Sequence, residues 1–142
     1  MMRLVAMAVL IAAAGLSAFS CATVPAQTEP LAPGEMRLLK IEVPPGDLYG
    51  NIVQVFDILF EADGHPAVRR ACFYWSGDGP YCSSVKRVSY GSPGTIQVEL
   101  RPNPPSTRAY GTYKLEGYVE YIRDGKPART NVVDVYISVI LK

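Results

Sequence analysis

Two stretches near the C-terminus alternate apolar and polar residues with a period of two. From Tyr113 to Ile122 the odd-numbered positions share one face, and from Asn131 to Leu141 every second residue is Val, Ile or Leu. Successive side chains of a β-strand point to opposite faces, so this pattern predicts strands with one buried and one wetter face. Such strands are typical of antiparallel sheet. We therefore expect an all-β fold.

Short β-rich runs separated by Gly, Pro, Asn, Asp and Ser fill the rest of the chain from Met36 onward. Five further strands are expected, at residues 37–43, 51–61, 68–75, 81–90 and 95–100, followed by a proline-rich crossover at 101–109. Both faces of the 51–61 run are partly apolar, which favours a central position in a sheet. About seven strands predict a single antiparallel β-sandwich over residues 36–142, with a small up-and-down β-barrel as the alternative.

The start of the 113–122 strand carries a motif. Residues 109–115 read Ala-Tyr-Gly-Thr-Tyr-Lys-Leu, which resembles the D-x-G-x-Y-x-C run at the sixth strand of immunoglobulin domains, and the region as a whole resembles bacterial immunoglobulin-like (fibronectin-type) domains. The resemblance implies a corner tyrosine, Tyr113, whose hydroxyl bonds to the backbone of the preceding crossover. Leu115 stands where the family has cysteine, so no inter-sheet disulfide of the antibody kind is implied.

A turn-rich segment separates two of the three cysteines. Between Cys72 and Cys82 lies Ser-Gly-Asp-Gly-Pro, and a chain folded back about Gly77 places the two cysteines opposite each other. This predicts a disulfide across a β-hairpin. The spacing is unlike the C-x-x-C of redox pairs, so a structural role is expected.

The same segment contains the only tryptophan and the densest aromatic cluster. We expect Trp75 to belong to the core, where immunoglobulin domains keep their tryptophan. Tyr74, Asp78 and Tyr81 are the candidate partner-binding residues at the exposed end of the hairpin, with Tyr74 and Tyr81 expected on or near the face opposite the core. Tyrosine suits this role because it combines a large contact area with a polar hydroxyl.

The N-terminus has the pattern of an export signal. A positively charged start at Arg3 precedes an unbroken apolar run from Leu4 to Leu16. The run is shorter than the roughly 20 apolar residues of a membrane span. It predicts a signal peptide over residues 1–20 rather than the alternative, a retained membrane anchor helix.

Leu16 to Cys21 reads Leu-Ser-Ala-Phe-Ser-Cys, which resembles the lipobox of bacterial lipoproteins, where the cysteine is acylated. Pairing of the other two cysteines leaves Cys21 odd, and acylation explains it. Residues 21–35, rich in Pro and Ala, then form a tether. The resemblance implies a lipid-anchored, periplasm-facing protein of the bacterial cell envelope. Cleavage after Ala22 or Ala26 is the alternative and leaves a soluble periplasmic or secreted protein.

Charge composition excludes some partners. The chain has 14 basic and 13 acidic residues, and removal of the leader with Arg3 leaves 13 of each. This balance argues against nucleic acid as a partner and against an electrostatic footprint for anionic membranes. The pairs Arg69–Arg70 and Lys86–Arg87 are candidates for a small anion-binding patch. Strand alternation weakens that case, because each pair should place one charge on each face.

Other site candidates are weak. His65 is the only histidine and lies in a turn, which excludes a His-rich metal site, and no nucleophile motif accompanies it. We expect no metal, no cofactor and no catalysis. The turns at 63–67 and 124–128 read Asp-Gly-His-Pro-Ala and Asp-Gly-Lys-Pro-Ala, and both are expected to be tight hairpin turns.

These observations favour an exported, lipid-anchored envelope protein with a non-catalytic protein-binding or structural β-sandwich. Its partners are the membrane, through the lipid on Cys21, and an unidentified envelope protein or glycan. The alternative is a carbohydrate-binding or enzyme-inhibitor module that uses the Cys72–Cys82 hairpin. A small hydrolase is the least favoured class, because the usual catalytic apparatus is missing.

Overall fold

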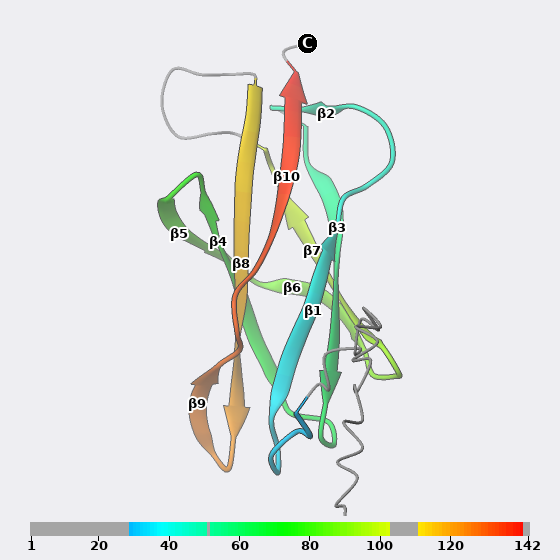
Figure 1. The fold of residues 1–142 in the computed structure, drawn as a ribbon, viewed down its shortest axis with the longest axis vertical. Helices are drawn as coiled ribbons and strands as arrows, with labels where there is room; N and C mark the ends of the chain where they lie inside the picture. The colour runs from blue at the N-terminus through cyan, green and yellow to red at the C-terminus, as the bar shows by residue number, and fades with distance from the viewer. Residues whose placement is uncertain (1–28, 51, 103–110, 141–142) are drawn as a thin grey trace, which may run out of the picture.

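The computed structural model is a sandwich of two β-sheets (Figure 1). It describes residues 29–50, 52–102 and 111–140. One sheet has four strands in the order β1-β3-β7-β6, and the other has six, in the order β2-β10-β8-β4-β5 with β9 paired to β8. The strands are β1 (Met36–Glu42), β2 (Leu48–Tyr49), β3 (Gln54–Ala62), β4 (Val68–Trp75), β5 (Asp78–Ser83), β6 (Val85–Ser89), β7 (Gly94–Leu100), β8 (Gly111–Arg123), β9 (Lys126–Arg129) and β10 (Val133–Ile140).

The prediction of an all-β, antiparallel sandwich is confirmed. Every strand pairing is antiparallel except the short one between β2 and β10. Consecutive strands change sheet at the β1–β2, β2–β3, β3–β4, β5–β6 and β7–β8 connections, which an up-and-down barrel does not do. Without β2 and β9, the two strand orders are those of an immunoglobulin-like sandwich.

The described part of the chain has ten strands where the sequence predicted about seven. The run expected at 81–90 is two strands, β5 and β6, which lie in different sheets and are separated at Ser84. β2 has two residues and β9 has four. Segments this short show no measurable alternation of apolar and polar residues, so the sequence pattern does not predict them as strands.

The core lies between the facing sheets, and the faces predicted for the long strands are confirmed. β3 is central in its sheet, between β1 and β7, as expected. Trp75 is 6% exposed and belongs to the core. The fully enclosed apolar side chains include Phe56, Ile58 and Phe60 from β3, Ile96 and Val98 from β7, Phe73 from β4, and Leu115 and Val119 from β8.

The two Asp-Gly turns make different connections. Asp124–Gly125 closes the β8–β9 hairpin, with positive φ angles of 51° and 72°. Asp63–Gly64 leads from β3 to β4, which lie in different sheets, so the predicted hairpin is wrong there. Because β3 already pairs with β1 and β7 on its two edges, it has no free edge for the next strand.

Both turns lie at the end of the sandwich where β1 begins, which we name the tether end (Figure 1). The described part of the tether, residues 29–35, binds there. Arg123 Nε donates to the carbonyl of Pro33 at 3.0 Å, and the Gly34 amide donates to Asp63 Oδ2 at 2.8 Å. The part of the predicted 21–35 tether that the structure describes is thus bound to the sandwich, and residues 22–28 lie between Cys21 and the first described residue.

The first strand is joined to the opposite sheet at the same end. The amide of Met36, the first residue of β1, donates to the hydroxyl of Tyr121 on β8 at 3.2 Å. Both side chains are 2% exposed. A buried amide needs such a partner, so this bond fixes where the tether stops and the sandwich starts.

Candidate functional site

The β4–β5 hairpin is braced as the sequence predicted. Cys72 and Cys82 face each other across the two strands and form a disulfide, with their Cα atoms 4.0 Å apart. β5 is the edge strand of the six-stranded sheet, so the disulfide ties an edge strand to its neighbour. Pro80 lies in β5, a position that an edge strand tolerates because it leaves one side of the ladder unpaired.

The turn of this hairpin is also held in place. Its central residues, Ser76 and Gly77, have positive φ angles of 46° and 90°, the pattern of a two-residue type I′ turn. The Ser76 amide donates to the carbonyl of Lys114 at 2.8 Å, and the Lys114 amide donates to Ser76 Oγ at 3.2 Å. The turn is thereby bound to β8 by two hydrogen bonds.

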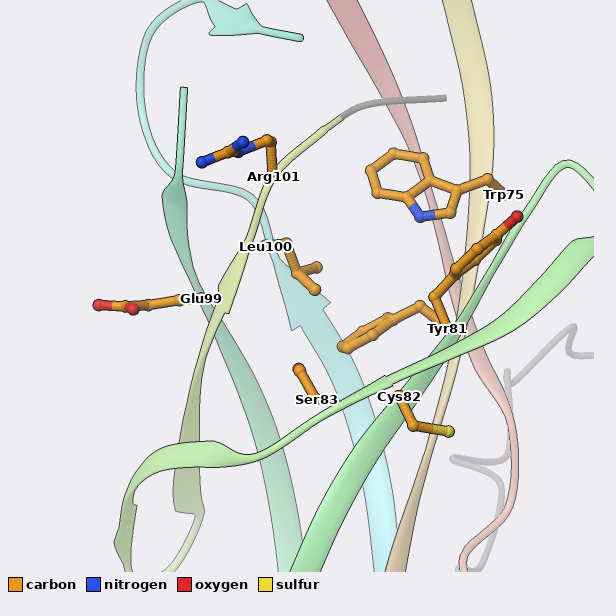
Figure 2. A pocket seen from close by; sticks show the side chains of 8 residues that line it. Trp75, Tyr81, Cys82, Ser83, Glu99, Leu100 and Arg101 are labelled. Carbon is orange, nitrogen blue, oxygen red and sulfur yellow. The ribbon is translucent and has the colours of Figure 1, made fainter. Parts of the chain in front are cut away.

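A cavity of about 210 Å³ lies beside the hairpin, between β5 of one sheet and β7 of the other. We name it the β5–β7 cavity. In Figure 2, Trp75, Leu100 and Ser83 project into this space, whereas Glu99 and Arg101 point away from it. The remaining lining residues are Phe73, Tyr81 and Cys82. The cavity is thus mainly aromatic and apolar.

Tyr81 forms the exposed wall of the cavity and is 46% exposed. Its hydroxyl donates to Asp78 Oδ2 at 3.2 Å. Desolvation, and then the hydrogen bond and the charge of Asp78, raise the pKa of the Tyr81 hydroxyl above its usual value. The phenol therefore stays protonated at neutral pH and its ring is held by a directed bond.

Ser83 supplies an unused polar group at the cavity. Its Oγ is buried and has no hydrogen-bond partner among the described residues. A buried hydroxyl without a partner costs about 1–3 kcal/mol. Because this oxygen is buried, a ligand in the cavity would reach it only after the Ser83 side chain moved.

The structure separates the three predicted contact residues. Tyr81 is paired across the strands with Phe73, on the inward face of the sheet. It stays exposed because β5 is an edge strand, so the expectation that it lies opposite the core face is wrong. Tyr74 lies on the outward face, half-buried, with its ring 6.2 Å from that of Tyr118. Tyr81 and Asp78 form one site, and Tyr74 belongs to another.

Sequence reasoning named only Arg69–Arg70 of the second site and missed its partners. On the outward face of the six-stranded sheet, the guanidinium of Arg129 lies 4.9 Å from the centre of the Tyr118 ring. Its Nη2 is also 3.5 Å from Glu120 Oε1, and Arg70 Nε contacts Glu120 Oε2 at 2.5 Å. Arg129 lies on β9, a strand of four residues, which is too short for an alternating pattern to predict it from the sequence. The pairing of β8 with β4 places Arg70 beside Glu120, and the pairing of β8 with β9 places Arg129 there.

His65 is exposed, as expected, and stacks on Tyr90 with ring centres 4.5 Å apart. Tyr90 donates its hydroxyl hydrogen bond to the carbonyl of Pro66. The cavity beside these rings is lined by Phe60, Ala62, Gly64, His65, Tyr90 and Gly91, with no carboxylate. Within the described ranges, no cluster of three or more His, Cys, Asp or Glu residues could hold a metal ion.

Some predictions fall outside the described residues. The signal peptide and Cys21 lie in residues 1–28, and most of the crossover that should accept the Tyr113 hydroxyl lies in 103–110. Tyr113 itself packs edge-to-face against Trp75 at 6.4 Å. Among the described residues there is no helix with the length and apolarity needed to cross a membrane. No family model, curated protein or solved structure matches the chain.

Proposed function

We propose that the chain is an exported, lipid-anchored protein of the bacterial cell envelope whose β-sandwich binds another envelope protein without catalysis. The observation that carries this proposal is the exposed Tyr81 ring beside a cavity on a braced hairpin. A disulfide, a two-residue turn and two bonds to β8 fix that hairpin. Such pre-organisation lowers the entropic cost of binding.

The cysteines support the location. Cys72 and Cys82 are paired in the structure, so Cys21 is the remaining one of three. Structural disulfides are typical of exported proteins and rare in the bacterial cytoplasm. A lipid on Cys21 accounts for the third cysteine, and mass spectrometry of the mature N-terminus tests it. A diacylated or triacylated Cys21 supports the anchor, and a free N-terminus at Thr23 or Gln27 contradicts it.

Photo-crosslinking in intact cells tests the contact. A photoreactive phenylalanine analogue replaces Tyr81 in one variant and Tyr136 in the control variant. Tyr136 is 68% exposed on β10, on the outward face of the six-stranded sheet. We expect a discrete crosslinked protein species from position 81 and none from position 136. Equal crosslinking from both positions, or none from position 81, would overturn the assignment of the contact to this hairpin.

A glycan is the second candidate ligand, because the aromatic rings of Phe73, Trp75 and Tyr81 line the β5–β7 cavity. Aromatic faces pack on the apolar side of a sugar ring, while its hydroxyls need hydrogen-bond partners. Trp75 is the only tryptophan, so its fluorescence reports directly on occupancy. Titration with N-acetylglucosamine and glucose trisaccharides should shift the emission with one of them, and the Tyr81→Ala variant should abolish the shift. An unchanged emission spectrum with both sugars would exclude this candidate.

A further inference from the structure

The tether end carries a cationic cluster on the outward face of the six-stranded sheet. It consists of Arg69 and Arg70 at the start of β4, Arg129 on β9 and Glu120 on β8. The side chains of Arg70 and Arg129 are 53% and 65% exposed, and that of Glu120 is 16% exposed. Arg70 and Arg129 contact the Glu120 carboxylate, and with Arg69 the cluster has a net charge of 3 − 1 = +2.

A β-bulge explains why two adjacent arginines act on the same carboxylate. The pairing of β4 with β8 shifts register between Val68 and Arg70, which inserts Arg69 as an extra residue and breaks the alternation of faces. The pKa of Glu120 is lowered first by its hydrogen bond to Arg70, opposed by desolvation, and then by the charges of Arg70, Arg129 and Arg69. The sequence expectation of one charge per face is therefore wrong for this pair.

The cluster has hydrogen-bond donors to spare. A guanidinium has five N–H groups in a planar fork, and Glu120 offers only two oxygens to Arg70 and Arg129. The Tyr118 ring, 4% exposed, supports the Arg129 guanidinium from below. Exposed, orientated guanidinium forks match phosphate oxygens in geometry as well as in charge.

The adjoining β8–β9 turn adds to the positive charge. Arg123 and Lys126 flank Asp124 there. The near-zero net charge of the chain does not reveal this local excess of basic residues, because composition carries no information on where the charges lie in the fold. The outward face of the six-stranded sheet is therefore cationic at this end, whereas the carboxylates of Glu35, Glu61 and Asp63 lie with β1 and the tether.

The position of the cluster relative to the tether decides what it faces. The tether binds Arg123 on the same strand as Glu120, at the same end of the sandwich (Figure 1). Seven residues separate Cys21 from Glu29, a span of roughly 25 Å when fully extended. With an acyl chain on Cys21, this end of the sandwich stays close to the lipid headgroups.

We propose that Arg69, Arg70 and Arg129 bind the headgroup phosphates of anionic phospholipids in the membrane that holds the Cys21 lipid. This inference rests on the proposed lipid anchor. The two or three acyl chains expected on Cys21 already hold the chain at the membrane, so contacts of the cluster with headgroup phosphates would act on the orientation of the sandwich. The contact would orient the sandwich with its tether end on the membrane and its hairpin turned away from it.

Vesicle co-sedimentation tests the cluster independently of the lipid. The mature chain with Cys21→Ser, which carries no acyl group, is mixed with phosphatidylglycerol or phosphatidylcholine vesicles. We expect binding to the phosphatidylglycerol vesicles only. Each basic residue near an anionic surface contributes about 1 kcal/mol, so R69Q/R129Q should weaken binding roughly 30-fold.

The matched control removes the same charge from the other sheet. K86Q/R87Q alters two residues of β6 and should change binding less than about threefold. Glu120→Gln raises the charge of the cluster and should strengthen binding, which no unfolded variant would do. Equal losses in the two double variants, absence of a phosphatidylglycerol preference, or binding to soluble polyglutamate but not to vesicles would each overturn the proposal. Failure here leaves the N-terminal mass spectrometry result untouched, so the two proposals fail separately.

Discussion

The tether end and the hairpin end of the sandwich are stabilised by different kinds of bond. At the tether end, polar bonds join residues distant in sequence, such as Gly34 with Asp63 and Met36 with Tyr121. At the hairpin end, a disulfide closes a loop within one hairpin. The hairpin also has two hydrogen bonds to β8, between Ser76 and Lys114, and the disulfide adds a covalent cross-link to them. Attachment and recognition can therefore occupy opposite ends without sharing residues.

Loss of the disulfide should lower the free energy of unfolding the most. The double variant C72A/C82A opens a loop of 11 residues, which the chain-entropy model values at about 2–3 kcal/mol. Urea unfolding followed by circular dichroism measures this loss. Dithiothreitol should destabilise the wild type and leave the variant unchanged. An unchanged unfolding midpoint would mean that the hairpin end needs no covalent brace.

Removal of one hydroxyl at the tether end should cost less. Tyr121→Phe leaves the buried amide of Met36 without its acceptor, which should lower the free energy of unfolding by about 1–3 kcal/mol. The same urea experiment measures it, with Tyr136→Phe as the exposed control. A loss no larger than that of the control would show that water replaces the hydroxyl.

Release of the tether should lower the free energy of unfolding by a smaller amount still, and its effect should be local. Asp63→Ala removes the acceptor of the Gly34 amide, worth about 0.5–1.5 kcal/mol as a net hydrogen bond. Hydrogen exchange should speed up at Gly34 and stay unchanged in β4 and β5. Faster exchange throughout the hairpin would contradict the independence of the two ends.

Removal of the ion pairs of Glu120 should change the free energy of unfolding the least. Its pKa in the folded state is lowered from the ordinary value of 4.5, so the charged form stabilises the fold above that pH. The contribution is lost as the pH falls through the lowered folded-state pKa. The urea midpoints of the wild type and Glu120→Gln should therefore differ at pH 7 and converge once the pH is low enough to protonate Glu120 in the folded state. A difference that persists in acid would assign the effect to packing.

The long strands were predictable because their side chains alternate over many residues. The inward faces of β4, β8 and β10 follow from sequence periodicity alone, and the disulfide follows from turn chemistry and cysteine spacing. Trp75 in the core was also predictable, since it lies in phase with Phe73 on one strand. These features depend on residues close together in the sequence, so they can be predicted without knowledge of the tertiary structure.

Features that depend on tertiary neighbours were not predictable. The exposure of Tyr81 comes from the edge position of β5, which no local pattern reveals. The shared action of Arg69 and Arg70 on Glu120 comes from a register shift between strands distant in sequence. The two Asp-Gly turns have nearly the same residues, but one closes a hairpin and the other connects the two sheets. The difference arises because both edges of β3 are paired, with β1 and β7.

The direction of β1 has a mechanical consequence. The strand begins at the tether and runs away from it along the sandwich, paired antiparallel with β3 over the register from Met36 to Glu42 (Figure 1). A pull on the tether therefore acts along the strand axis, while the ladder hydrogen bonds lie across it. The load is shared as shear among the bonds of the ladder instead of unzipping them one at a time. A domain drawn between a membrane and a partner would resist force where its chain enters the sheet.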